Sequence, residues 1–539
     1  MEYKIIESKN YLNLQKKMNI NSLLSKVLDF HHYDQKTLHT LFHPRLIYHD
    51  FSLFEESDMV LDRIHEAIEN QEKICIYGDY DCDGILATTI LVQAFLELGV
   101  EVGYHIPHRF EDGYGLNVNR VKQMAEKGYS LIITVDNGVK SFDAVECANE
   151  LGIDVIITDH HQFDVDLPDA CAFIHTKLSP DYPFKEISGG FVAYKLASAL
   201  LGHQDKYLYC LAAITTISDM MPLLDENRSV VKKALTLMKE EKYQSLELLL
   251  DNKDYTTTSI GFVIAPKINS FGRLPEYCHP NILVKYFLKN ASFDLRMKVA
   301  QYAKQINQKR QSLTNEQYAL ANPCKDLPFL YYASEDIHEG LVGLIAGKYT
   351  REYEKPSFVM HYDKKNGIYK GSARSVEGFS LHDFFMRHED ELLVYGGHAL
   401  AGGFSLNEEH FDCFYHSIED EVKNLNLHSV QEVLLIEEND LCVENIESLS
   451  LLEPFGMGNE EPLFCLKNIK ILNTQQLSQG KHLKFDLISR HGKISALYFQ
   501  KGALYDQVKN LQTINLIGTL SINEFRQQKI MNFIIKDIL

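Results

Sequence analysis

The sequence has no tryptophan, no C-x-x-C pair and no uninterrupted run of 18 apolar residues. Without paired cysteines a zinc ribbon is not expected, and ten cysteines spread singly from Cys75 to Cys465 give no support to a disulfide framework. Without a long apolar run we expect no transmembrane helix. The first 20 residues lack the apolar segment and the cleavage site of a secretory signal. These absences together predict a soluble protein of the reducing cytoplasm.

Basic residues are fewer than acidic ones. The sequence has 54 Lys and Arg and 74 Asp and Glu, which give a formal net charge of −20. A balance this acidic argues against a generally basic protein that coats nucleic acid. It still allows a nucleic-acid enzyme that gathers its positive charge in one groove. The apolar share of 45% and the charged share of 24% exclude a disordered or fibrous chain. The length of 539 residues predicts three or four domains.

Residues 1–50 are expected to form a helical N-terminal extension, and residues 51–312 a domain of alternating strands and helices that ends in a long helix. Short β-branched runs alternate there with amphipathic stretches such as Ile85–Leu98 and Ser141–Leu151. Such alternation is typical of right-handed βαβ units around a parallel sheet, whose ligands bind at the carboxyl ends of the strands. The expected strands are Ile74–Tyr77, Val102–Ile106, Leu131–Val135, Val155–Thr158 and Cys171–Ile174.

A second α/β domain is expected over residues 313–429, followed by an acidic connector over residues 430–462. The connector contains nine acidic residues and no basic one. Residues 463–539 reverse this balance, with eleven basic and four acidic residues, and their pattern favours five short strands with little helix. This pattern predicts a small barrel of the OB-fold type. The expected fold class is therefore α/β, with two α/β domains joined by a long helix and a C-terminal β-barrel.

Three carboxylates follow the first expected strand at alternating positions, Asp79, Asp81 and Asp83. Carboxylates this close repel one another, and their clustering at a strand end costs stability unless a cation compensates. Mg²⁺ and Mn²⁺ prefer oxygen ligands of this kind. Gly84 opens a helix whose amino end could face a phosphate, although an acidic, solvated turn would also explain the motif taken alone.

Two more expected strands end in polar residues: Asp136 follows one, and the triplet Asp159-His160-His161 follows another. A predicted apolar helix also ends at Asp219. Taken singly, Asp136 could belong to an ordinary turn, the histidines could be a surface or core pair, and Asp219 could simply end its helix. Because the carboxyl ends of parallel strands share one edge of the sheet, convergence in a single site explains the set better.

Together, the polar residues at these strand and helix ends offer carboxylate and imidazole ligands for two metal ions. Two metals about 3.5–4 Å apart suit in-line displacement at phosphorus, and Asp136, central in the expected sheet, is the natural bridging ligand. Imidazole among the ligands favours Mn²⁺ over Mg²⁺. The candidate ligands are Asp79, Asp81, Asp83, Asp136, His160, His161 and Asp219.

In order and spacing, the D-Y-D-x-D-G, V-D-N-G, D-H-H and S-D motifs resemble those of the DHH phosphoesterase superfamily. Further segments narrow the resemblance to its RecJ family of single-strand-specific exonucleases, which the chain resembles over roughly residues 50–539. Those segments are Pro107–Arg109, Gly113–Leu116, Ile264–Leu274, His338–Gly343, Lys370–Ser375, Gly396–Gly403 and Pro454–Asn459.

The resemblance implies a nuclease that uses two divalent ions, Mn²⁺ or Mg²⁺, and degrades single-stranded DNA from 5′ to 3′ into mononucleotides during DNA repair and recombination. It implies a monomer without membrane association, with a single-strand-binding protein and a helicase as partners. His161 is implied to lie beside the scissile phosphate, with Asp159 orienting the histidine pair. The implied metal ligands are Asp79, Asp81, Asp83, Asp136, His160 and Asp219. The implied phosphate-binding residues are Arg109, Arg273, Ser372, Arg374, Gly397 and His398, with Lys481 and Lys484 as candidate contacts on the barrel.

The sequence departs from the family pattern at three positions, with Ile337 in place of Trp, Lys267 in place of Arg and His175 in place of Asn. Two other functions stay open. A phosphodiesterase acting on short oligonucleotides or cyclic dinucleotides would resemble the first two domains alone, so the basic C-terminal barrel favours long single strands. An inactive DNA-binding scaffold would be expected to lose acidic ligands, which this chain retains.

Overall fold

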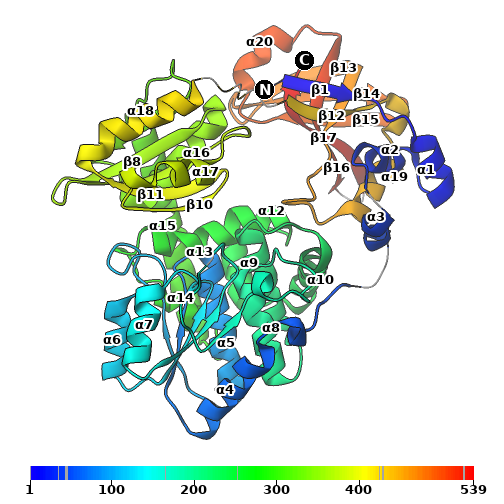
Figure 1. Ribbon diagram of the computed structural model, residues 1–539. Coiled ribbons are helices and arrows are strands. Elements are labelled where there is room, and N and C mark those ends of the chain that lie inside the picture. The colour runs from blue at the N-terminus through cyan, green and yellow to red at the C-terminus, as the bar shows by residue number, and fades with distance from the viewer. Residues whose placement is uncertain are drawn as a thin grey trace. The chain divides into compact units, whose positions relative to one another are not determined.

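The computed structural model describes residues 2–33, 35–42, 46–163, 166–251, 253–423, 425, 427, 430–525 and 528–539. They form two compact units, one made of Met1–Arg45 with His428–Leu539 and the other of Leu46–Leu427 (Figure 1). The larger unit contains two α/β domains and the smaller contains a β-barrel, which confirms the predicted fold class. Every helix in the described part of the chain is too short or too polar to span a bilayer.

The first α/β domain is built on a parallel five-stranded sheet in the order β3-β2-β4-β5-β6. The chain leaves β2 for the edge strand β3 and then returns to the other side of β2 as β4, so the strand order reverses there. Such a reversal is where a parallel sheet opens a crevice for ligands. The strands are β2 (Ile74–Tyr77), β3 (Gly103–His105), β4 (Leu131–Val135), β5 (Asp154–Thr158) and β6 (Ala172–Ile174), close to the predicted runs.

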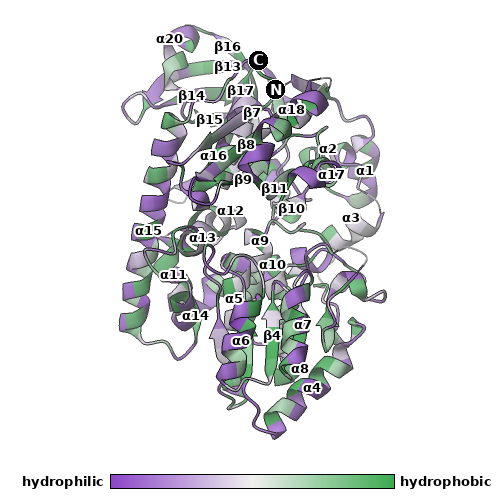
Figure 2. Cartoon of the chain, turned by 60° about the vertical axis from the view of Figure 1, so that its left-hand side comes forward, coloured by the Kyte–Doolittle hydropathy of each residue, from purple (hydrophilic) through white to green (hydrophobic). Residues whose placement is uncertain are grey.

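Helices cover both faces of this sheet, which explains why β2 and β4 are apolar and buried along their whole length (Figure 2). On one face, α6 (Val118–Glu126) and α7 (Phe142–Glu150) contribute Val121 and Val145 to the core. The helices that contribute to the core of the other face are α4 (Ser57–Glu69), α5 (Cys82–Glu97), α8 (Gly189–Leu201) and α9 (Lys206–Ser218).

A helical layer follows and ends in the long helix α15 (Phe293–Leu320), which contains the predicted helical segment Ala300–Ser312. The side chain of Ser292 caps α15 by accepting a hydrogen bond from the backbone N–H of Leu295. The other members are α10 (Asp225–Glu241), α11 (Gln244–Leu250), α12 (Thr257–Ser259), a π-helical turn (Ile260–Ile264), α13 (Ala265–Arg273) and α14 (Asn281–Phe287).

The second α/β domain has a five-stranded sheet in the order β10-β11-β9-β8-β7, in which β7 and β8 are parallel and the other pairs antiparallel. The hairpin β10–β11 was not predicted, because the glycines of Gly396–Gly403 are uncommon in strands. The strands are β7 (Leu330–Ser334), β8 (Ser357–Asp363), β9 (Ile368–Arg374), β10 (Val394–His398) and β11 (Ala401–Asn407). The main helices are α16 (Val342–Tyr353), α17 (Leu381–Arg387) and α18 (Phe411–Val422).

In the smaller unit five strands close a barrel in the order β13-β14-β15-β17-β16, because β16 also pairs with β13. β15 and β17 are parallel and the other barrel pairs antiparallel. This closed arrangement confirms the predicted OB-type barrel. The strands are β13 (Phe464–Leu477), β14 (His482–Ser489), β15 (Gly492–Tyr498), β16 (Thr513–Phe525) and β17 (Gln528–Ile538).

The smaller unit also holds strands where the sequence predicted a helical extension and an acidic connector. β1 (Glu2–Ile6) pairs in parallel with β12 (Val430–Ile436), which pairs with β13 in turn; Figure 1 shows β1 in blue beside the orange and red strands. Lys26 forms a buried ion pair with Asp440 at 2.7 Å. Net charge carries no information about backbone pairing, so it did not reveal the strand in the acidic segment. The helices here are α1 (Tyr11–Met18), α2 (Ser22–Phe30), α3 (Gln35–Phe42), α19 (Val443–Glu447) and α20 (Tyr505–Val508).

A buried ion pair joins α8 to α10 in the larger unit. Lys195 and Glu226 have fully buried side chains, and the Lys195 Nζ lies 2.8 Å from Glu226 Oε2. The same ammonium donates to the carbonyl oxygen of His49 at 2.6 Å, and the Tyr182 hydroxyl donates to Glu226 Oε1 at 2.5 Å. Breaking such a pair leaves one charge buried without its partner.

Glu226→Ala should therefore destabilise the larger unit by about 3–5 kcal/mol. Urea denaturation followed by circular dichroism measures the change. Glu241→Ala is the matched control, because it removes the partner of the exposed Lys206 and should leave the unfolding midpoint unchanged. Equal midpoints for wild type and Glu226→Ala would contradict a structural role for the buried pair.

Candidate active site

Asp81 and Asp83 lie at the start of α5, directly after β2. The Oδ1 of Asp81 caps the helix by accepting a hydrogen bond from the backbone N–H of Gly84 at 3.0 Å. The two carboxylate oxygens of Asp83 accept hydrogen bonds from the backbone N–H groups of Gly189 and Gly190, at 2.8 and 2.7 Å. Because these two amides begin α8, the positive end of a second helix stabilises the Asp83 carboxylate.

Asp79 and Asp136 follow the carboxyl ends of the neighbouring strands β2 and β4. Asp136 has a φ of 63°, a left-handed conformation that aspartate and asparagine adopt more readily than most residues. Gly189 packs against its carboxylate, and a Cβ added there would lie 2.5 Å from Asp136 Oδ1. The approach of α8 to the site therefore requires glycine, and the Ser188–Gly190 segment is a functional feature that the sequence analysis missed.

The triplet Asp159-His160-His161 follows β5, and Asp159 organises it. The buried Asp159 Oδ1 accepts hydrogen bonds from the backbone N–H groups of His160 and His161, at 2.7 and 3.1 Å, and lies 2.8 Å from His161 Nδ1. The imidazole of His160 points the other way. Its Nε2 lies 3.1 Å from Asp136 Oδ1 and 3.5 Å from Oδ2 of Asp219, the residue that ends α9.

Three groups of side chains at this edge could each hold a metal ion, and Asp136 and His160 each belong to two of them. Among the described residues, four ligand atoms of this cluster are buried without a hydrogen-bond partner: Asp79 Oδ1, Asp136 Oδ1, His160 Nε2 and Asp219 Oδ2. Unbonded buried polar atoms are costly, so the donor set fits divalent cations. The groups are Asp136 with His160 and His161, Asp83 with His160 and Asp219, and Asp79 with Asp81 and Asp136.

Burial and mutual repulsion raise the pKa of four carboxyl groups in this cluster. The pKa of Asp79 rises to about 8 and that of Asp83 to about 7, first through burial and then through the charge of Asp81. The pKa values of Asp136 and Asp219 lie well above the usual range, through burial and then the charge of Asp83. A bound divalent cation would reverse these shifts, because it stabilises the ionised carboxylates.

The two histidines of the triplet have opposite environments. Burial lowers the pKa of His160 well below its usual value, which leaves the neutral imidazole that metal ions require. Burial would also lower the pKa of His161, but the charge and hydrogen bond of Asp159 outweigh it and raise that pKa to about 9. The fully buried His175 lies with Nε2 3.0 Å from the carbonyl oxygen of His161, so it supports the histidine loop.

Four arginines form a second cluster in the larger unit, which we call the arginine cluster. Burial and the nearby charges of Arg109, Arg310 and Arg374 lower the pKa of Arg273 to about 9. The Arg109 guanidinium lies 4.2 Å from the ring centroid of Tyr80, the residue between two of the carboxylates. Like charges gathered around neutral oxygen acceptors indicate an anion-binding site. Those acceptors are Gly272 O, Gly340 O, Asn307 Oδ1, Ser372 Oγ and Ala373 O.

Arg310 is the member of the arginine cluster that the sequence analysis missed. It lies on α15, and the buried Asn307 Oδ1 accepts hydrogen bonds from its Nε and Nη2 at 3.0 and 2.8 Å. In sequence it belongs to a polar helical run, N-Q-K-R-Q, in which an arginine would ordinarily face solvent. It is half-buried, and the packing of α15 against α13 brings its charge within reach of Arg273.

Ser372 and Arg374 reach the arginine cluster from β9. Arg374 Nη1 donates to Ser372 Oγ at 2.9 Å, which orients both side chains. A Cβ added at Gly343, in the first turn of α16, would lie 3.0 Å from Ser372 Oγ and 3.2 Å from Arg374 Nη2. The missing side chain at Gly343 therefore leaves space in front of the two groups that would contact an anion.

Gly397 and His398 end β10, beside the partner strand β11. Gly397 has a φ of 137°, and a Cβ there would lie 2.3 Å from the carbonyl oxygen of Ala401, so this close strand pairing requires glycine. Burial and then the charge of His161 lower the pKa of His398, which places the β10–β11 hairpin within electrostatic reach of the histidine triplet.

The remaining residues singled out in the sequence lie outside the two clusters. Lys481 is exposed just before β14, and Lys484 on that strand lies 3.1 Å from Asp486, both in the smaller unit. The buried Lys267 donates to the carbonyl oxygen of Leu249 and to Asp251 Oδ2, at 2.5 and 2.6 Å, so it anchors the end of α11. Ile337 is a core residue.

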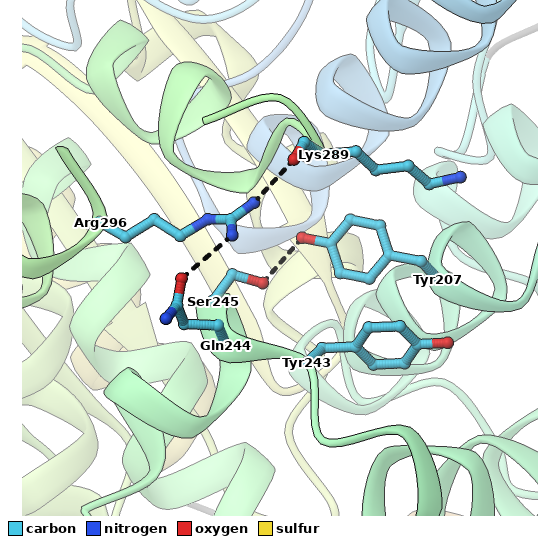
Figure 3. A pocket seen from close by; sticks show the side chains of 6 residues that line it. All are labelled: Tyr207, Tyr243, Gln244, Ser245, Lys289 and Arg296. Carbon is cyan, nitrogen blue, oxygen red and sulfur yellow. Dashed lines mark hydrogen bonds between the residues drawn. The ribbon is translucent and has the colours of Figure 1, made fainter. Parts of the chain in front are cut away.

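A separate pocket of about 240 Å³ lies at the amino end of α9, at the opposite end of this helix from Asp219 (Figure 3). Arg296 donates to Gln244 Oε1 at 3.2 Å, and the Tyr207 hydroxyl lies 2.8 Å from Ser245 Oγ. Both carboxylates of the nearby group Glu97, His203 and Asp205 already pair with the ammonium of Lys289, at 2.7 Å each. These contacts account for the polar side chains that line the pocket, so we assign no ligand to it.

Gly189→Ala should disturb the cluster without removing a ligand, because its Cβ overlaps the Asp136 carboxylate. We expect the rise in melting temperature caused by Mn²⁺ to be much smaller than in wild type. Gly261→Ala is the matched control, since the atom nearest to its Cβ is Ile217 Cγ2 at an ordinary 3.7 Å. A full Mn²⁺ response in Gly189→Ala would count against a metal site at Asp136.

Three family models match the chain: the DHH family N-terminal domain over residues 73–218, the DHHA1 domain over residues 326–424 and the RecJ OB domain over residues 434–537. The single-stranded-DNA-specific exonuclease RecJ of Bacillus subtilis is 35% identical over an alignment of 498 positions that covers 88% of this chain and 62% of that protein. The chain thus spans less than two thirds of the B. subtilis relative.

The Haemophilus influenzae exonuclease of the same name is 30% identical over an alignment of 542 positions that covers 93% of this chain and 92% of the relative. A crystal structure of Thermus thermophilus RecJ in complex with Mn²⁺ matches with a TM-score of 0.84 and 25% identity, over 100% of this chain and 79% of that one. With its DHH, DHHA1 and RecJ OB domains in order along the sequence, the chain belongs to the RecJ family.

Proposed function

We propose that this chain is an exonuclease that hydrolyses single-stranded DNA from the 5′ end toward the 3′ end, releases mononucleotides and serves DNA repair and recombination. The observation that carries the proposal is the presence, in one unit, of a carboxylate–imidazole cluster with four unbonded ligand atoms and an arginine cluster whose guanidinium groups donate to neutral oxygens. Its relatives are named as single-stranded-DNA-specific exonucleases, which supports the same activity.

The proposed cofactor is a pair of divalent ions, Mn²⁺ in preference to Mg²⁺ because one ligand is an imidazole. When bound, such ions lower the pKa of water and neutralise the charge that develops on the phosphate. Asp136 is the proposed bridging ligand, because it is shared between two of the metal-binding groups. The proposed ligands are Asp79, Asp81, Asp83, Asp136, His160 and Asp219.

The arginine cluster explains the proposed 5′ polarity. A 5′-terminal phosphate carries more negative charge than an internal one, so Arg109, Arg273 and Arg374 would bind the strand end best. Arg109 rests on Tyr80, whose neighbours in sequence are ligands, so the two clusters adjoin. A strand whose 5′-phosphate occupies the arginine cluster would then present its first phosphodiester to the ligands, which yields a mononucleotide.

His161 is the proposed contact to the scissile phosphate. Asp159 accepts the Nδ1–H of its imidazole and stabilises its charged form, so the ring can donate from Nε2 to a phosphate oxygen. His398 and the backbone of Gly397 are the proposed contacts from the second α/β domain.

The barrel is proposed to hold the strand beyond the site through basic side chains and exposed aromatic rings. Lys481 and Lys484 are the proposed contacts, and Phe499, which is 52% exposed, adds a ring on which a base could stack. Tyr498 is only 5% exposed and packs in the core. A basic barrel favours long single strands over the dinucleotide substrates of the alternative hypothesis.

The proposed partners follow from the substrate. Single strands arise when a helicase unwinds a duplex and a single-strand-binding protein coats the product, so both would meet this enzyme at its substrate. We propose that the chain acts on them as a monomer in the cytoplasm, where bacterial DNA is found.

Cleavage of end-labelled DNA with Mn²⁺ tests the proposed function. Single strands should release labelled mononucleotides at once from a 5′ label and only late from a 3′ label, whereas blunt duplex should persist. Asp136→Asn should abolish turnover, and it is a better probe than Asp136→Ala because asparagine tolerates the positive φ. Cleavage of a dinucleotide alone would support the phosphodiesterase alternative, and tight DNA binding without cleavage would support the inactive scaffold.

Arg374→Ala should lower the preference for a 5′-phosphate over a 5′-hydroxyl end by about tenfold or more, because a charge-assisted hydrogen bond contributes about 1.5–3 kcal/mol. The ratio of kcat/KM for the two ends measures this preference. Arg387→Ala is the control in the same domain, since Arg387 pairs with Glu421 at the surface. An unchanged ratio in Arg374→Ala would exclude the residue from end recognition.

A further inference from the structure

Tyr114 contacts the imidazole of His161. Its hydroxyl oxygen lies 3.2 Å from Nε2 and 3.3 Å from Nδ1, and the two rings meet edge to face with centroids 5.8 Å apart. Because the hydroxyl oxygen is almost equidistant from the two nitrogens, it lies on the N–H axis of neither, and with Nδ1 2.8 Å from Asp159 Oδ1 the Nε2 is left for a phosphate oxygen. The imidazole of His161 therefore has two contacts, a buried carboxylate at Nδ1 and a phenol hydroxyl between its two nitrogens.

The loop that carries Tyr114 is fixed on both sides. Before Tyr114, Asp112 Oδ1 accepts a hydrogen bond from Arg120 Nε at 2.8 Å. After it, the carbonyl oxygen of Gly115 accepts a hydrogen bond from the Tyr77 hydroxyl at 3.1 Å. Tyr77 is the last residue of β2, so the strand that leads into the carboxylate motif also fixes the loop of Tyr114.

Tyr114 is 53% exposed, so half of this large side chain remains open to solvent beside a buried catalytic cluster. On its other side lies the ring of Tyr80, edge to face at 6.5 Å, on which the Arg109 guanidinium rests at 4.2 Å. The two tyrosines thus connect His161 with the arginine cluster. The sequence analysis used Gly113–Leu116 only as part of a resemblance and assigned Tyr114 no role.

We infer that Tyr114 is a positioning residue for the proposed hydrolysis, whose hydroxyl contacts the His161 imidazole between its two nitrogens and so keeps Nε2 directed toward the scissile phosphate. The inference rests on the proposed function. Asp159 alone selects the tautomer but leaves the ring free to tilt about its Nδ1 hydrogen bond. The second contact, from the Tyr114 hydroxyl, removes that freedom, and small losses of orientation cost large factors in rate.

Tyr114→Phe tests the inference, because it keeps the ring and removes only the hydroxyl. We expect kcat on 5′-phosphorylated single strands to fall about tenfold while KM changes less than about twofold, since orientation is lost and strand binding is kept. The rise in melting temperature with Mn²⁺ should equal that of wild type. Tyr129→Phe is the matched control, because Tyr129 lies against Lys73 at the amino ends of the strands and should keep wild-type kcat.

A spectroscopic readout separates positioning from a merely structural effect. In protein labelled with ¹⁵N at histidine, with His161 assigned through His161→Gln, Tyr114→Phe should shift the Nε2 resonance of His161 and leave that of His160 in place. Both the fall in kcat and the Nε2 shift are required, and the absence of either overturns the inference. Failure of the proposed function can be told apart from failure of this inference, because in that case the wild-type chain itself would not cleave DNA.

Discussion

Repulsion among buried carboxylates at the carboxyl edge of one parallel sheet is the constraint on which the rest of the site depends. Burial and neighbouring charges raise the pKa of Asp79, Asp83, Asp136 and Asp219 together. Backbone amides at the start of α8 stabilise Asp83, and the close approach of that helix is possible because Gly189 has no side chain. Divalent ions would complete the site by binding the remaining unbonded oxygens and the neutral imidazole.

The net charge of −20 is compatible with a nucleic-acid enzyme because the charges are sorted in space. Acidic groups that would bind cations lie beside four arginines that would bind a strand end, and both clusters belong to the larger unit. Basic residues outnumber acidic ones again on the barrel strands. Tyr80 and Tyr114 lie between the ligand cluster and the arginine cluster, which gives end recognition a physical connection to His161.

Strands with strong apolar character, such as Ile74–Tyr77 and Leu131–Val135, were predicted at their observed residues, because burial on both faces gives an unambiguous pattern. The β10–β11 hairpin was not predicted, since its glycines are selected for close backbone approach and not for β propensity. The candidate ligands were identifiable because metals require particular donor atoms at strand ends. Gly189 and Arg310 were not, because their importance arises from helix packing between segments distant in sequence.

The most direct test of the account is a crystal structure of the chain with Mn²⁺, measured at a wavelength that reveals manganese by anomalous scattering. We predict two manganese peaks about 3.5–4 Å apart at the carboxyl ends of β2 and β4, with the Asp136 carboxylate between them and His160 bound to one. A map with no peak at this edge, or with Asp136 uncoordinated, would contradict the account.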